Sequence, residues 1–134
     1  MTTELVYCDT SAVAKLVMAE DGSDDVTRMW ESPDIRLVSS ELLVTELLRS
    51  ARRHSAARAK LALRVIAGVH LVALSRDILT SAGHLEPPAL RSLDAIHLAT
   101  ALALGQDLAR LATYDERLIE AAQAYGLEVF PAPV

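Results

Sequence analysis

The chain of 134 residues has the length of one ordinary domain with room for a sizeable core. Hydrophobic residues make up 51% of it and aromatic residues only 4%, which favours helices packed on an aliphatic sheet over an aromatic-rich β-sandwich. The net charge of −5 excludes binding of a polyanion through bulk charge, so such binding requires a local basic patch or bound cations.

The one cysteine and the apolar runs indicate the cellular compartment of the protein. Cys8 lies in an apolar run, which excludes a disulfide within the chain and predicts a small buried hydrophobic side chain. The first residues do not resemble a signal peptide, and no run approaches the ~20 apolar residues of a membrane span. We therefore expect a cytoplasmic protein that has no membrane partner.

Short apolar runs alternate with helical patterns along the chain. In chain order we expect strand 5–8, helices 12–18 and 26–30, strand 35–38, two helices in 40–67 that separate near His54 and Ser55, strand 69–74, helices 77–82 and 92–104, strand 108–113, helix 115–125 and strand 127–130. This alternation predicts one α/β domain with a mainly parallel sheet. Ligand sites in such sheets lie beyond the carboxyl ends of the strands.

Two acids directly follow predicted strands. Asp9 comes after the first strand, where it is equally suited to capping the next helix. Asp115 comes after the fourth strand, where Thr113 and Glu116 could form a capping box with Asp115 as an acid of the first helical turn. Their positions at strand ends make both acids candidates for a site.

Two further acids lie on predicted helices. Glu46 is at the margin of an apolar helical face, and a surface ion pair with Arg49 or Arg53 is the alternative. Asp94 opens a helix that is apolar nearly all round, so burial there is costly unless the acid is paired or binds a metal. Favourable interaction with the positive helix end is the alternative for Asp94.

The four acids together predict more than each does alone. If they converge in the fold, their carboxylates repel one another and raise one another's pKa. Hard cations such as Mg²⁺ or Mn²⁺ relieve this repulsion, because they prefer oxygen ligands and leave positions for water and phosphate.

Four segments, each with one of these acids, resemble in order the motifs of the PIN-domain nucleases and, among them, of the VapC toxins. They read VYCDTSA at 6–12, VTEL at 44–47, LRSLDAIHLATA at 90–101 and ATYDERL at 112–118. The last segment has Tyr114 where Phe is commoner. The resemblance covers essentially the whole chain.

The resemblance implies a three-layer α/β/α sandwich that forms one nuclease domain over 1–134. It also implies an endoribonuclease that depends on Mg²⁺, with Mn²⁺ as a substitute, and that forms a homodimer. A VapB-like antitoxin would inhibit it in a toxin–antitoxin hetero-oligomer.

If the protein is such a nuclease, we expect the four acids to have different roles in the hydrolysis of RNA. Asp9 and Asp94 are expected to bind the metal directly, and Glu46 to bind it or to orient the attacking water. Asp115 would hold a second cation or complete the outer shell. Supporting hydroxyls, for which helix capping is the commoner role, come from Thr113, Thr10 and Ser11.

Basic residues follow Glu46 closely, at Arg49, Arg52, Arg53, Arg58, Lys60 and Arg64. We expect the first three to contact RNA or an acidic antitoxin segment, although a solvated helical face is the ordinary explanation. The four histidines show no zinc-site spacing. His97, one turn after Asp94 on the same side of the helix, is expected to be a hydrogen-bonded structural residue, and lining the pocket is the alternative.

Other functions are alternatives to the toxin. A PIN nuclease could act in RNA processing or on DNA, and a non-catalytic interaction module would use the acids only as caps. A haloacid-dehalogenase-like domain fits poorly because Ser11 stands where its second acid is needed, and a receiver domain because no lysine follows the last strand.

Overall fold

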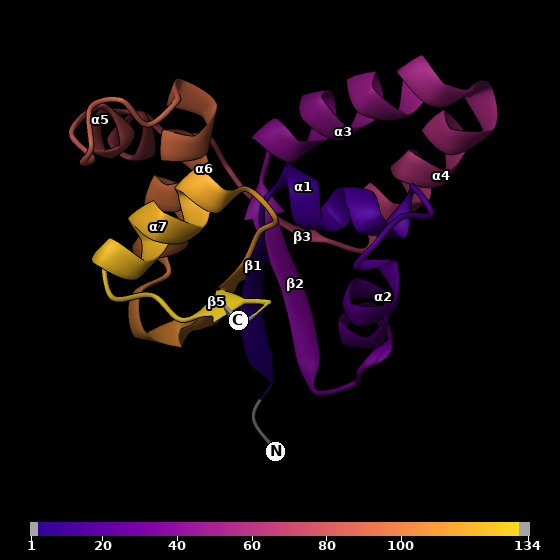
Figure 1. Cartoon of the computed structure of the whole chain (residues 1–134), viewed down its shortest axis with the longest axis horizontal. Coiled ribbons are helices and arrows are strands. Elements are labelled where there is room, and N and C mark those ends of the chain that lie inside the picture. Colours follow the sequence, from indigo (N-terminus) through magenta and orange to yellow (C-terminus); the bar gives the residue numbers. More distant parts are fainter. Residues whose placement is uncertain (1–2, 132–134) are drawn as a thin grey trace.

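The computed structural model describes residues 3–131, and one sheet forms the centre of that range (Figure 1). Its strands are β1 (Glu4–Cys8), β2 (Ile35–Ser40), β3 (His70–Val72), β4 (Leu108–Ala112) and β5 (Val129–Phe130). They lie in the order β3-β2-β1-β4-β5, and every neighbouring pair is parallel. The predicted α/β class and parallel sheet are confirmed.

The helices connect these strands. They are α1 (Thr10–Val13), η1 (Ala14–Leu16), α2 (Ser23–Glu31), α3 (Leu42–His54), α4 (Ala56–Ala67), α5 (Arg76–Gly83), α6 (Ser92–Ala103), η2 (Gly105–Asp107) and α7 (Glu116–Ala124). The predicted break near Ser55 is confirmed, because its hydroxyl caps α4 by accepting a hydrogen bond from the Arg58 amide at 3.1 Å. The helix expected over 12–18 is shorter, since α1 tightens into the 3-10 turn η1.

Helices cover both faces of the sheet (Figure 1). Successive side chains of a strand point to opposite faces, so Val6 and Cys8 join the core beneath α1–α4, whereas Tyr7 joins the core beneath α6 and α7. Helix α5 packs on α6 through Ala82 and Ala95. The three-layer α/β/α sandwich is therefore confirmed.

Cys8 is a fully buried free thiol, as expected, and burial raises its pKa well above the usual range. Among residues 3–131, no helix has both the length and the apolar character needed to cross a bilayer.

The strand order creates one special position at the carboxyl edge of the sheet. The chain runs outward from β1 to β2 and β3, and then crosses back to β4 on the other side of β1. The pairing of Cys8 with Ala112 places the residues that follow both strands next to each other. Parallel sheets bind ligands at such a change of direction, and Asp9 and Thr113 begin the two loops there.

Candidate functional site

Asp9 is the most enclosed of the four candidate acids, with 3% of its surface exposed. One oxygen, Oδ1, caps α1 by accepting from the Ala12 amide at 3.0 Å and also accepts from the Ser11 hydroxyl at 2.7 Å. The other, Oδ2, accepts from the Thr113 hydroxyl at 2.6 Å. Burial raises the pKa of the Asp9 carboxyl, although the hydrogen bonds of Thr113 and Ser11 oppose this rise.

Thr113 joins the two loops at the switch point. Its buried hydroxyl donates to Asp9 and accepts from the Asp115 amide at 3.1 Å. The expectation that Thr113 caps α7 is wrong: Asp115 is the N-cap, and its Oδ1 accepts from the amides of Arg117 and Leu118 at 2.9 and 3.2 Å. An aspartate directly before the helix fills the cap, so the threonine is free to contact Asp9.

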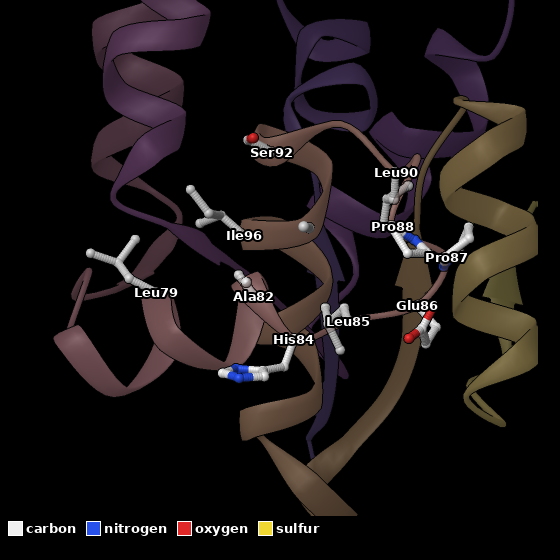
Figure 2. A pocket seen from close by; sticks show the side chains of 12 residues that line it. Leu79, Ala82, His84, Leu85, Glu86, Pro87, Pro88, Leu90, Ser92 and Ile96 are labelled. Carbon is white, nitrogen blue, oxygen red and sulfur yellow. The ribbon is translucent and has the colours of Figure 1, made fainter.

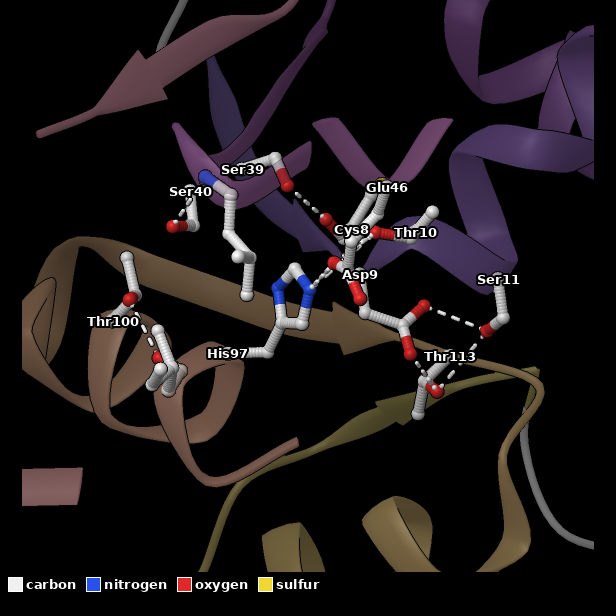
Figure 3. Close-up of polar contacts among 12 residues, drawn as sticks. Cys8, Asp9, Thr10, Ser11, Ser39, Ser40, Glu46, His97, Thr100 and Thr113 are labelled. Atoms are coloured by element: carbon white, nitrogen blue, oxygen red, sulfur yellow. Dashed lines mark hydrogen bonds and ion pairs between the residues drawn. The ribbon is translucent and has the colours of Figure 1, made fainter. Parts of the chain in front are cut away.

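Glu46 extends from α3 toward the same edge and has a side chain that is 24% exposed. Its Oε1 accepts hydrogen bonds from the Thr10 hydroxyl at 2.7 Å and from His97 Nε2 at 2.8 Å (Figure 3). The hydrogen-bonded partner of Glu46 in the structure is therefore His97 rather than Arg49 or Arg53. Burial alone would raise the pKa of Glu46, but the hydrogen bonds from His97 and Thr10 outweigh it and lower the pKa.

Asp94 lies in the first turn of α6 and is partly buried. Burial raises the pKa of its carboxyl, and the negative charges of Asp115, Asp9 and Glu46 raise it further. Three acids that are distant in sequence therefore lie within electrostatic reach of Asp94. The structure brings the four predicted acids into one region, which we call the acidic cluster: Asp9, Glu46, Asp94 and Asp115.

The donor chemistry of the acidic cluster fits a hard divalent cation, because carboxylate oxygens are its preferred ligands and the repulsion at Asp94 favours added positive charge. Within residues 3–131, no three His, Cys, Asp or Glu side chains are grouped closely enough to hold one ion by themselves. Any cation bound here would accordingly need water or substrate among its ligands.

Known proteins match this chain over nearly its full length. The sequence profile of the PIN domain family matches residues 6–124. Ribonuclease VapC46 of Mycobacterium tuberculosis is 41% identical over 124 residues, which cover 92% of this chain and 95% of that protein. The chain belongs to the PIN-domain family. The resemblance seen in the sequence motifs is confirmed.

Solved structures agree with this PIN domain in fold. VapC20 of M. tuberculosis, described as a toxin that cleaves the sarcin–ricin loop, superposes with a TM-score of 0.69 at 17% identity, covering 91% of this chain and 95% of that one. A chain of a toxin–antitoxin complex from Klebsiella pneumoniae gives 0.64 at 21% identity, with coverage of 82% and 86%.

The basic residues of this PIN domain differ in their exposure and in their contacts. Arg49, Arg52 and Arg53 are exposed on α3 and line a surface hollow of about 270 Å³. At 100° per residue, Arg49 and Arg53 lie on the same side of α3 as Glu46. Arg58 instead donates to the Val17 carbonyl at 2.6 Å, which fixes α4 against the end of η1.

A larger cavity of about 500 Å³ lies elsewhere, between α5, the loop before α6 and α6 itself (Figure 2). Leu79, Leu85 and Ile96 give it apolar walls, and Glu86 is the one acid among the residues that line it. None of the acidic cluster lines this groove. Its lining mixes these apolar side chains with polar ones such as His84, and the groove lies apart from the acidic cluster.

His97 is a buried, hydrogen-bonded residue, as the sequence suggested, but its partners were not foreseen. It is 2% exposed and contacts Tyr7 as well as Glu46. Tyr7 was not singled out, because a tyrosine in a buried strand ordinarily serves as core. The available signal was the spacing of His97 one helical turn after Asp94, which placed it near the cluster without naming a partner.

Proposed function

We propose that this PIN domain is a metal-dependent endoribonuclease and acts as the toxin of a toxin–antitoxin pair. The acidic cluster at the switch point carries this proposal, since it unites four carboxylates from four parts of the chain. The ribonuclease name of its 41% identical relative supports RNA as the substrate. The cation is Mg²⁺, for which Mn²⁺ substitutes.

The four acids have distinct roles in the proposed reaction. Asp9 and Asp94 bind the cation, Glu46 binds it or orients the attacking water, and Asp115 holds a second cation or an outer-sphere water. Magnesium typically keeps several waters and uses one or two carboxylates, which agrees with a cluster that lacks a closed set of three ligands. When bound, the cation lowers the pKa of its water and offsets charge on the phosphate.

The hydroxyl groups around Asp9 hold that carboxylate before any substrate arrives. Ser11 and Thr113 each donate to one of its oxygens, so its orientation is fixed by both loops of the switch point. The Thr10 hydroxyl likewise donates to Glu46 and helps to fix the orientation of its carboxylate. Hydrolysis in line with the departing 3′-oxygen leaves a 5′-phosphate and a 3′-hydroxyl.

We assign RNA contact to the exposed arginines of α3, with an acidic antitoxin segment as their alternative partner. Arg49 and Arg53 share the side of α3 that carries Glu46, which suits phosphates passing toward the acids. This local patch presents positive charge on a chain whose net charge is −5.

A VapB-like antitoxin and a second copy of the chain complete the proposed assembly. The toxin–antitoxin complex among the solved neighbours supports the first partner. Leu79 of α5 and Leu93 of α6, which are 45% and 47% exposed, offer apolar contacts for the second. The cytoplasmic location expected from the sequence stays a prediction.

The proposal is tested by incubating purified protein with RNA, and separately with DNA of the same sequence, in Mg²⁺ or in EDTA. We expect RNA cleavage that requires the metal and is lost in Asp9→Asn. Asp77→Asn is the matched control, because Asp77 is an exposed acid in the first turn of α5, outside the cluster. Mapping 5′-phosphate ends then identifies the sites cut.

Other outcomes of this experiment favour the other functions. Metal-dependent cleavage of DNA alone indicates a DNA-acting PIN nuclease, and no cleavage together with no cation binding indicates an interaction module. Cleavage that persists in EDTA and in Asp9→Asn contradicts the proposed site.

A further inference from the structure

Three side chains from three elements form a hydrogen-bonded chain behind the acidic cluster. The Tyr7 hydroxyl on β1 lies 2.7 Å from His97 Nδ1 on α6. On the other side of the ring, His97 Nε2 lies 2.8 Å from Oε1 of Glu46 on α3, and Figure 3 shows these two side chains. Tyr7 and His97 are buried, at 0% and 2% exposure, whereas Glu46 reaches partly exposed surroundings. These hydrogen bonds therefore connect the core of the protein to the acidic cluster.

The direction of these hydrogen bonds follows from the groups involved. An ionised carboxylate only accepts, so Nε2 of His97 is the donor to Glu46. In the neutral ring Nδ1 is then the acceptor, and the Tyr7 hydroxyl donates to it. The two rings also meet edge to face, with centroids 5.9 Å apart and planes at 67°. Tyr7 thus holds the orientation of the imidazole from the side opposite Glu46.

Both donors to Glu46 end on the same oxygen. His97 and Thr10 converge on Oε1, and no hydrogen bond from the described part of the chain ends on Oε2. This arrangement holds the carboxylate by one oxygen and leaves the other for water or a cation. Because Thr10 directly follows Asp9, the same network also fixes Glu46 relative to the Asp9 loop.

We propose that His97 is a positioning residue, which orients the Glu46 carboxylate in the acidic cluster. The inference rests on the proposed function, since it assigns to Glu46 a task in cation or water binding. It goes beyond the four acids by extending the site inward to His97 and Tyr7.

Two substitutions of His97 separate positioning from packing. In His97→Gln the amide nitrogen takes the place of Nε2, so a donor to Glu46 remains. In His97→Asn the amide reaches only the place of Nδ1, next to Tyr7, and the donor to Glu46 is lost. Both side chains are polar and similar in size, which makes them a matched pair.

Mn²⁺ affinity by isothermal titration calorimetry is the first measurement, with RNA cleavage and thermal unfolding alongside. Loss of an outer-shell partner lowers metal affinity or activity by about 10- to 100-fold, which we expect for His97→Asn. We expect His97→Gln to retain most of both. Leu98→Val, a buried change on the same helix, controls for lost stability and should lower only the melting temperature.

Tyr7→Phe keeps the experiment decisive if His97→Asn does not fold. It removes only the hydroxyl that holds the ring, and loss of one hydrogen bond corresponds to an about 2- to 10-fold drop in Mn²⁺ affinity. Equal losses in the Gln and Asn variants, or wild-type affinity in Tyr7→Phe, overturn the inference. Absence of both Mn²⁺ binding and cleavage in the wild type overturns the proposed function instead.

Discussion

The Thr113 hydroxyl donates to Oδ2 of Asp9 at 2.6 Å, across a separation of 104 residues in the sequence. This contact ties the loop after β4 to the loop after β1, at the point where the acidic cluster forms. It also satisfies an oxygen of a carboxylate that is nearly inaccessible to water.

Replacing Thr113 by valine keeps the shape of the side chain and removes that donor. We expect the metal-free protein to lose about 1–3 kcal/mol of stability, because a buried acceptor is left without its partner. Urea unfolding in EDTA measures this loss. Thr113→Ser keeps the hydroxyl and is the control, so equal stability of the two variants would show that the contact contributes little.

Asp94→Asn should change how stability depends on pH. A carboxyl whose pKa is raised on folding favours the folded state at low pH, and that contribution is lost as the pH rises through the folded pKa. The ionised Asp94 is therefore unfavourable at neutral pH without metal. We expect the stability gain from Asp94→Asn to be larger at pH 7.5 than near pH 4, the usual pKa of an aspartate (about 3.9).

Thermal unfolding at both pH values in EDTA measures this difference. Asp77→Asn is again the control, because it also removes an acid from the first turn of a helix. Added Mn²⁺ should reverse the order and stabilise the wild type more than Asp94→Asn, since only the folded wild type has the full ligand set. A pH-independent gain would contradict the repulsion that we describe.

Neutralising the exposed arginines of α3 should weaken RNA binding without sequence preference. For single-stranded RNA each phosphate contact contributes about 0.7 to the slope of log K against log salt. Converting Arg49, Arg52 and Arg53 to glutamine should therefore reduce the magnitude of this slope by about 2. Fluorescence anisotropy with catalytically inactive protein provides the affinities.

A control variant with the same net charge distinguishes the effect of this patch from the effect of the protein's overall charge. Its three glutamine substitutions are at exposed arginines on other elements: Arg28, Arg36 and Arg76. An equal change in slope for the two triple variants would show that the α3 patch has no special role.

Local sequence patterns were sufficient for most of the fold. Strand β1 and the acid after it follow from an apolar run that ends in Asp9, and the break before α4 follows from the capping serine, Ser55. The length of β3 was less predictable, because only three of the six expected residues pair with β2. Pairing depends on the neighbouring strand, which a local pattern does not contain.

The partners of the site residues could not be predicted in the same way. Glu46 meets His97 rather than a nearby arginine, because the tertiary fold brings together α3 and α6, which are far apart in the sequence. The influence of Asp115 on Asp94 likewise depends on the packing of α6 against α7. Strand order is a property of the folded sheet, and the sequence motifs pointed to it only through the family resemblance.

The most direct test of the central claim is a crystal structure of the protein soaked with Mn²⁺, with data collected at the manganese absorption edge. The account predicts an anomalous peak within coordination distance of Asp9 and Asp94, with Glu46 reached directly or through water. A peak away from these acids, or no peak at a Mn²⁺ concentration that supports RNA cleavage, would contradict it.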